Sequence, residues 1–285
     1  MRGNFSTGEI SSDGETICSN GDPAEIGSTS AASGGDGSIT YKWQANGIDI
    51  ADSNSATYDP PAGLTATTTY TRFAKEGTCN TSFTPSTGSY LVTVRGNLIA
   101  GEISSSGESI CNNGDPALIG STTAASSSEG AITYKWQANG VDIENSNSDS
   151  YDPPAGLTTT TTYTRFAKDG TCYTSFTPSL GSYMVTVNPN LTSSVNIVAD
   201  NAVYPNAIAI TASAVNGGTS PIYQWYNGTT AVGTNSATYT TTTLTLGQSL
   251  AIKVVMTSNA TPCLTDSPAT SNSIKIATPK VPSVS

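Results

Sequence analysis

One stretch of this 285-residue chain occurs twice almost unchanged. Residues 8–94 align without a gap on residues 101–187, so that Gly8 matches Gly101 and Val94 matches Val187. Solenoid repeats run about 20–45 residues, and this unit is much longer. The repeat is long enough to enclose a core of its own, so we predict two successive domains of one fold.

A third, diverged unit follows the short linker Asn188-Pro189-Asn190. Its segment PIYQWYNG around Trp225 matches ITYKWQANG around Trp43 and Trp136. We therefore predict three domains, with a Pro-rich linker ending the last one; they cover residues 1–95, 96–188 and 189–285. The residues from Met1 onward align with those from Val94 onward, so we also expect the chain to be part of a longer array.

Short strands joined by polar turns account for the composition of each unit. Thr, Val, Ile and Tyr dominate the patterned stretches, and Gly, Asn, Asp and Pro separate them. In the first unit the expected strands are 8–12, 15–18, 24–31, 38–45, 54–58, 66–75 and 88–95. About seven short strands and one Trp in a unit of this size predict an all-β fold, namely three tandem immunoglobulin-like β-sandwich domains.

Alternation along the strands identifies the expected core. Tyr41 and Trp43 share one face of their strand, opposite Lys42. The predicted core residues are Trp43, Trp136, Trp225, Tyr41 and Tyr134. On the strand 66–75 the pattern leaves two alternatives open, because either Tyr70 or Phe73 can face inward. We expect Arg72 and Arg165 to be structural, partnered by an acidic or backbone oxygen.

Five cysteines follow the repeat. Cys18 and Cys79 recur as Cys111 and Cys172, so we expect one disulfide within each repeat, joining loops at one end of the sandwich. Buried free thiols and a metal site are the alternatives. Cys263 occupies the loop position of the third unit, and Tyr204 stands where its partner is expected. We predict an unpaired thiol at Cys263, with pairing between chains as the alternative.

The bulk composition excludes several classes of function. The chain contains no His, which rules out Ser-His-Asp and Cys-His catalysis and His-containing zinc sites. A net charge of −10 speaks against binding nucleic acid, which needs a basic surface. No stretch approaches the roughly 20 apolar residues that a membrane span needs. We predict that the protein is not an enzyme and does not insert into a membrane.

Two ligand sites remain as hypotheses. Calcium prefers six to eight oxygen ligands, and acidic and amide side chains gather in two loops without the usual calcium-loop spacing. These side chains are Asp142, Glu144, Asn145, Asn147, Asp149, Asp152, Asp49, Asp52 and Asp59. A carbohydrate-binding face would need exposed aromatic rings, for which Phe83, Phe176 and Tyr173 are the candidates. We expect no cofactor, with calcium as the less favoured alternative.

The motifs W…YDPPAGLT…TTYTR…GTC in the first two units resemble Ig-like repeats of very large Bacteroidetes cell-surface proteins of the gliding-motility adhesin type. The third unit is similar to the PKD-like modules of such proteins. It departs from the repeats by lacking the second cysteine. The resemblance implies export by type IX secretion and display at the cell surface, and it carries over no catalytic residue.

Together these features predict a structural stalk or filament segment of a large secreted adhesin, extracellular and stabilised by disulfides. The expected partners are neighbouring modules of the same long chain, and self-association into a fibre is a further hypothesis. A module that binds a polysaccharide or a protein, and an accessory region of a secreted polysaccharide-degrading enzyme, are the alternatives.

Overall fold

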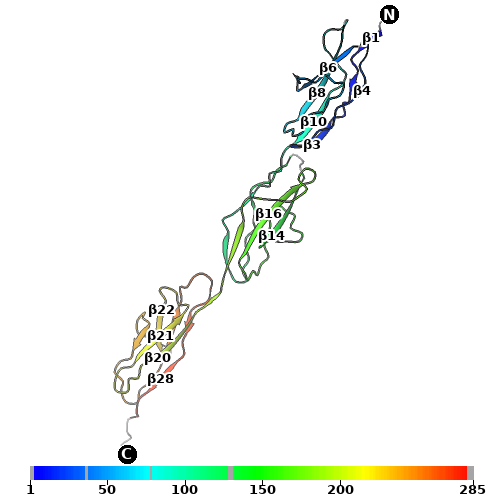
Figure 1. The fold of residues 1–285 in the computed structure, drawn as a ribbon. Coiled ribbons are helices and arrows are strands. Elements are labelled where there is room, and N and C mark those ends of the chain that lie inside the picture. Colours follow the sequence, from blue (N-terminus) through cyan, green and yellow to red (C-terminus); the bar gives the residue numbers. More distant parts are fainter. Residues whose placement is uncertain (1–2, 36–37, 78, 128–130, 281–285) are drawn as a thin grey trace, which may run out of the picture. The chain divides into compact units, whose positions relative to one another are not determined.

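The computed structural model describes residues 3–35, 38–77, 79–127 and 131–280. Every regular element in these ranges is a β-strand, as the composition predicts. The fold is therefore all-β and consists of immunoglobulin-like β-sandwiches (Figure 1). Met1 and the last five residues of the predicted Pro-rich linker lie outside the described residues.

The chain forms two compact units. The first unit comprises Met1–Ser104, Gly120–Tyr151 and Tyr163–Ser182, and the second comprises Ser105–Ile119, Asp152–Thr162 and Tyr183–Ser285. The division runs through the second repeat. The three-domain boundaries 1–95, 96–188 and 189–285 therefore stay predictions.

One large sheet dominates the first repeat. Its order is β3-β10-β8-β6-β7, with β9 also paired to β8. The strands are β3 (Glu15–Cys18), β10 (Tyr90–Arg95), β8 (Thr68–Glu76), β6 (Ile39–Ala45), β7 (Ile48–Asp49) and β9 (Thr84–Pro85). β3 runs parallel to β10, and Cys18 lies opposite Arg95. The Asn46-Gly47 turn joins β6 to β7, and both residues have positive φ, as its sequence predicts.

The facing layer of the first repeat is made of short pieces. β2 (Glu9–Ile10) pairs with β4 (Ser28–Ser30), and β1 (Gly3–Ser6) pairs with β5 (Ser33–Gly35). The strand predicted at 54–58 is only a single bridge, from Tyr58 to Ile26. Just before this bridge, the carbonyl of Ser55 accepts a side-chain hydrogen bond, because the Trp43 indole N–H donates to it at 3.0 Å.

Packing in the first repeat decides the question left open on β8. Tyr70, Arg72 and Ala74 are buried, whereas Phe73 is half-buried on the outer face. Trp43 is fully buried, and the Tyr58 ring lies 5.6 Å from both the Trp43 and the Tyr70 rings. An aromatic column therefore fills the space between the layers.

The second repeat has the corresponding strands. They are β11 (Glu102–Ile103), β12 (Glu108–Cys111), β13 (Ser121–Thr123), β14 (Ile132–Ala138), β15 (Val141–Asp142), β16 (Thr161–Asp169), β17 (Thr177–Pro178) and β18 (Tyr183–Asn188). β12 runs parallel to β18, with Cys111 opposite Asn188. Trp136 lies opposite Arg165 on β16, as Trp43 lies opposite Arg72 on β8.

Residues 189–280 form two regular sheets and a small third one. Their orders are β20-β21-β24 and β23-β22-β25-β27, with β28 also paired to β25, and β19 pairs with β26. The strands are β19 (Leu191–Thr192), β20 (Ser194–Ala199), β21 (Ala209–Val215), β22 (Ile222–Asn227), β23 (Thr230–Val232), β24 (Thr238–Thr240), β25 (Ser249–Thr257), β26 (Leu264–Asp266), β27 (Ala269–Thr270) and β28 (Ile274–Ala277). Trp225 is fully buried among Ile197, Ile210, Ile252 and Val254.

Candidate functional site

Two disulfides join different parts of the repeat pattern. Cys18 of the first repeat bonds Cys172 of the second, with 5.5 Å between the Cα atoms. Cys111 of the second repeat bonds Cys263 in the C-terminal segment, at a Cα separation of 5.4 Å. In both cases a strand cysteine of one repeat bonds a loop cysteine of the repeat or segment that follows it in the sequence.

This pairing overturns the predicted one. The disulfides expected within each repeat, Cys18 with Cys79 and Cys111 with Cys172, are not formed, and Cys263 is bonded rather than unpaired. The two disulfides use four of the five cysteines, and Cys79 is the fifth, on the surface.

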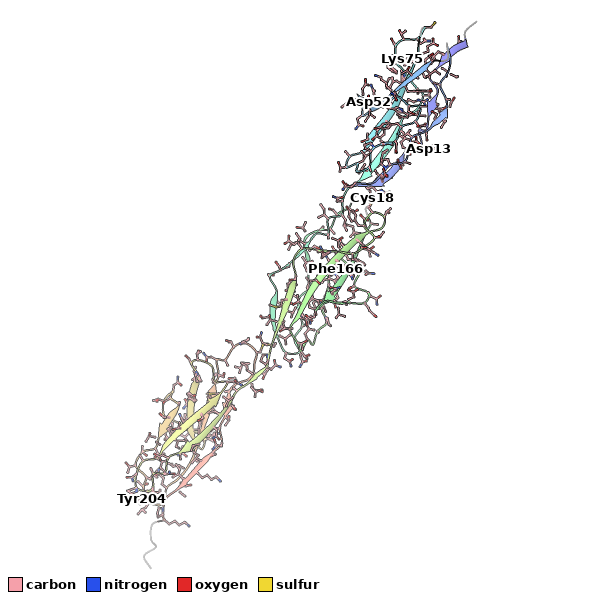
Figure 2. The ribbon with its side chains drawn as sticks, viewed as in Figure 1. Asp13, Cys18, Asp52, Lys75, Phe166 and Tyr204 are labelled. Atoms are coloured by element: carbon pink, nitrogen blue, oxygen red, sulfur yellow. A yellow bond between two sulfur atoms is a disulfide. The ribbon has the colours of Figure 1, made fainter. Side chains whose placement is uncertain are left out.

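The length of β8 explains why the pairing predicted within each repeat is wrong. Cys18 lies next to the end of β10, whereas Cys79 follows the far end of β8. A strand of nine residues spans about 27 Å, and disulfide-bonded Cα atoms lie within about 7 Å of each other. Figure 2 shows Lys75, near that far end, and Cys18 at opposite ends of the first repeat. Cysteines of one repeat are therefore too far apart to bond.

The strand cysteine sits where the chain leaves its own repeat. The backbone N–H of Ser19 donates to the carbonyl of Arg95 at 3.0 Å, and Gly21 N–H donates to Cys18 O at 2.8 Å. Arg95 is the last residue of β10, after which the chain continues toward the second repeat. The peptide linker and the disulfide therefore start side by side, giving two covalent connections between successive repeats.

The loop cysteine is held by a buried carboxylate. Asp169 accepts the backbone N–H groups of Thr171, Cys172 and Tyr173, the last at 2.7 Å. The Ser127 hydroxyl donates to its second oxygen at 2.8 Å. Burial acts to raise the pKa of Asp169, but the hydrogen bonds from Tyr173, Ser127 and the loop outweigh it and lower the pKa. The charged form of Asp169 thus fixes the loop that presents Cys172.

A second contact accompanies the first disulfide. The Tyr173 hydroxyl donates to the side-chain oxygen of Asn97 at 2.6 Å, so the residue after Cys172 is tied to the linker. The sequence makes Tyr173 a candidate for stacking on a carbohydrate. Its hydroxyl is instead hydrogen-bonded within the chain.

On its strand side, the second disulfide has the same backbone hydrogen bonding as the first. Asn112 N–H donates to Asn188 O at 2.8 Å, as Ser19 does to Arg95. Leu191 N–H donates to Cys263 O at 2.8 Å, and β19 pairs with β26 immediately after the cysteine. The chain that leaves the second repeat is thus hydrogen-bonded beside the cysteine that the disulfide reaches.

A buried arginine clamps each repeat. The Arg72 guanidinium is fully buried and donates to Ser86 Oγ at 3.0 Å, Ala56 O at 2.9 Å, Thr7 O at 3.3 Å and Ser28 Oγ. Among the described residues its acceptors are all neutral oxygens, so burial lowers the pKa of Arg72.

Arg165 repeats this arrangement in the second repeat, where it donates to Ser179, Asp149 O, Ala100 O and Ser121. Each guanidinium also lies on a tyrosine ring, Arg72 at 5.1 Å from the Tyr41 centroid and Arg165 at 5.2 Å from that of Tyr134. Tyr41 and Tyr134, predicted as core, are only half-buried and cover the arginines.

Two of the aromatic candidates, Phe83 and Phe176, are half-buried and lie beside lysines. Lys42 Nζ lies 5.3 Å from the Phe83 ring and Lys75 Nζ lies 4.6 Å from it, while Lys42 also bonds Asp49 at 2.9 Å. Lys135 and Lys168 cover Phe176 in the same way. Sugar stacking needs an open ring face, and these faces are used by cation–π contacts.

The acidic candidates for calcium do not gather. Asp49 and Asp142 each bond a lysine, and hydrogen bonds from Gln44 and Gln137, followed by those from Lys42 and Lys135, lower the pKa of these two carboxyls. In the described ranges no three His, Cys, Asp or Glu side chains come together as metal ligands. Because amide and backbone oxygens also bind calcium, the calcium hypothesis stays a prediction.

One apolar depression lies at the surface of the C-terminal segment. Ala202, Val203, Tyr204, Leu244 and Ile276 are among the residues that line it, and Tyr204 is labelled in Figure 2. Tyr204 and Lys275 are the ionisable side chains of this lining. In the part of the chain that the structure describes, no helix has the length and apolar character needed to cross a bilayer.

Solved structures that match the chain include cadherin and immunoglobulin-domain fragments. Mouse cadherin-23 EC22–24 aligns with 97% of this chain and 100% of its own, at 15% identity and a TM-score of 0.51. Human CDH23 EC21–23 covers 95% and 99% at 13% identity with a TM-score of 0.44, and Sidekick-1 immunoglobulin domains 1–5 cover 99% and 61% at 12% with 0.31. At these identities the first likeness shows the fold alone.

The repeat itself is matched by a family. No curated protein sequence matches the chain. The family described as "Domain of unknown function (DUF8696)" matches residues 6–95 and again residues 99–189, which together exceed half of the chain. The chain therefore belongs to the DUF8696 family.

Proposed function

We propose that this chain is a stalk segment of a large secreted cell-surface adhesin. In this stalk the first repeat is joined to the second, and the second repeat to the C-terminal segment, both by the peptide linker and by a disulfide. The observation that carries the proposal is the staggered disulfide pattern, Cys18–Cys172 and Cys111–Cys263. A strand cysteine at the end of one repeat bonds a loop cysteine of the following repeat or segment. The disulfide therefore restrains rotation about the peptide linker.

Two further observations support this proposal. Structural disulfides persist in oxidising compartments, which agrees with an extracellular location. A solved structure with a similar fold, mouse cadherin-23 EC22–24, is a cadherin fragment. The sequence resemblance to Bacteroidetes adhesin repeats extends the proposal to export by type IX secretion.

Covalent length gives a direct test. Through both disulfides the shortest path runs from Met1 to Cys18, back from Cys172 to Cys111, and from Cys263 to Ser285. This path contains about 100 residues, or about 340 Å when extended, against about 970 Å for the open chain. A stalk with these disulfides cannot be stretched beyond the shorter length, even when its domains unfold.

The measurement is single-molecule stretching of the chain held at its two ends. We expect the oxidised chain to stop near 340 Å and the reduced chain to reach about 970 Å. The control variant Cys18→Ser leaves one disulfide and a path of about 130 residues, so it should stop near 440 Å. An oxidised chain that extends to about 550 Å, the limit for disulfides within each repeat, would contradict the proposal.

A further inference from the structure

The cysteine that bonds Cys18 is not the nearest one in the sequence. Cys18 and Cys172 are separated by 154 residues, and Cys111 lies between them. Closing a longer loop costs more chain entropy, so an unfolded chain would favour a nearer thiol. Contacts other than the disulfide therefore bring Cys172 to Cys18 in the folded chain.

Asp169 supplies such contacts on the loop side. Its side chain is buried, and one carboxylate oxygen accepts the backbone N–H groups of Thr171, Cys172 and Tyr173 at 3.3, 3.1 and 2.7 Å. The other oxygen accepts the Ser127 hydroxyl at 2.8 Å. These bonds hold the backbone of the loop, so they can form whether or not the sulfur of Cys172 is bonded.

Tyr173 connects this loop to the linker. Its hydroxyl donates to Asn97 Oδ1 at 2.6 Å, and Asn97 follows the end of β10 at Arg95 by two residues. Cys18 lies opposite Arg95 on β3. The linker that leaves beside Cys18 is thus bound by the residue that follows Cys172.

The second disulfide has a linker contact of a different kind. Leu191 N–H donates to Cys263 O at 2.8 Å, and the Thr265 hydroxyl donates to Leu191 O at 3.2 Å. Here too a linker residue is bound to the loop around the cysteine, but through its backbone. The two disulfides are therefore accompanied by the same arrangement, built from different groups.

We infer that Asp169 and Tyr173 are positioning residues that select Cys172 as the partner of Cys18. Asp169 orders the loop, and Tyr173 binds it to the linker, so the two sulfurs meet before their bond forms. Holding two reacting groups together raises their effective concentration and favours their bond over others. The inference concerns the choice of partner and does not rest on the stalk function.

The bond forms by thiol–disulfide exchange with an external small-molecule disulfide such as glutathione disulfide. The thiolate of Cys172 attacks one sulfur of that disulfide and releases the first small thiolate. The thiolate of Cys18 then attacks the Cys172 sulfur of the mixed disulfide and releases the second. The two cysteines lose two electrons and two protons, and the external disulfide becomes two thiols.

The test measures both disulfides in one molecule. The full chain is equilibrated in mixtures of reduced and oxidised glutathione, quenched with acid, alkylated and mapped by mass spectrometry. Asp169→Ala should lower the equilibrium constant of Cys18–Cys172 at least about tenfold, because hydrogen bonds to a charged acceptor are lost. The constant of Cys111–Cys263 is the internal control and should stay within about twofold. Asp169→Asn keeps an acceptor oxygen and should recover part of the loss.

A second set of variants removes only the linker contact. Tyr173→Phe deletes one hydroxyl and keeps the ring, so it tests the inference even if Asp169→Ala does not fold. We expect a constant about 2- to 10-fold lower for Cys18–Cys172. Asn97→Ala should have the same effect, and the double variant should lose no more, because both changes break one contact. Circular dichroism of the reduced variants checks the fold.

The outcomes separate the two ideas. An unchanged Cys18–Cys172 constant in Tyr173→Phe or in folded Asp169→Ala would overturn the inference, as would equal losses at both disulfides. The stalk proposal would survive these results, since it needs only that the disulfides form. If the unaltered chain lacks Cys18–Cys172 and Cys111–Cys263, both ideas are overturned.

Discussion

Each repeat buries an arginine whose hydrogen-bond acceptors, among the described residues, are hydroxyl and backbone carbonyl oxygens. Arg72 brings together Thr7, Ser28, Ala56 and Ser86, which belong to four separate segments of the first repeat. Burying a charge is costly, and here the cost is offset by several hydrogen bonds and by the Tyr41 ring. The guanidinium supplies donors in a fixed plane, which lysine cannot reproduce.

The substitution Arg72→Lys should therefore destabilise the first repeat strongly. Lysine keeps the buried charge but leaves several of these oxygens without their donor, so we expect a loss of about 2–4 kcal/mol. Urea unfolding of the chain, followed by tryptophan fluorescence, measures the effect.

Two further variants complete this test. Arg165→Lys should cost the same, because Arg165 has the same four kinds of acceptor. Arg95→Lys, at a half-buried residue, should stay within about 0.5 kcal/mol. An Arg72→Lys chain that unfolds at the same urea concentration as the unaltered chain would show that the clamp contributes little.

Residue roles could be predicted from the sequence only where one face of a strand is distinctive. The three Trp residues are buried as predicted, because a large indole ring fits the space between two layers. The face of β8 could not be predicted, because Tyr70 and Phe73 place an aromatic ring on each side. Packing decides it, as the outer side gives Phe73 a contact with Lys42 and the inner side gives Tyr70 the aromatic column.

At the scale of elements, β3 decides where the strand cysteine lies. Its parallel pairing with β10 places Cys18 at the end of the repeat, and the turn before β3 approaches β10 closely. Gly14 in this turn has a φ of +66°, and a Cβ there would lie 2.6 Å from the carbonyl oxygen of Leu91. A side chain at this position meets backbone that cannot move without disturbing the strand pair.

We expect Gly14→Ala to destabilise the first repeat by about 1–3 kcal/mol, because it adds both backbone strain and a clash. Gly27→Ala is the matched control, since its Cβ would meet no atom within 4 Å and its φ is not positive. Urea unfolding of both variants compares them. Equal midpoints for Gly14→Ala and Gly27→Ala would refute this account of the turn.

Element positions were largely predictable, and element partners were not. The predicted strands 15–18, 38–45 and 88–95 correspond to β3, β6 and β10, because turn residues bound them in the sequence. The parallel pairing of β3 with β10 is a contact between distant segments that no local pattern records. Without it the cysteines of one repeat look close, although they lie at opposite ends. The number of cysteines does not distinguish the two pairing schemes, because each scheme uses four of the five.

At the scale of the whole molecule, the two disulfides connect successive parts of the chain. Each repeat and the C-terminal segment bury one Trp in their cores. Among the described residues no disulfide joins two cysteines of the same repeat. One disulfide therefore joins the first repeat to the second, and the other joins the second repeat to the C-terminal segment, so each adds a second connection to the peptide linker. The proposed stalk function depends on this stagger more than on any single surface residue.

Disulfide mapping tests this claim most directly. The oxidised chain is alkylated, digested without reduction and analysed by mass spectrometry. The account predicts linked peptides that contain Cys18 with Cys172 and Cys111 with Cys263. Linked peptides that contain Cys18 with Cys79 and Cys111 with Cys172 would contradict it.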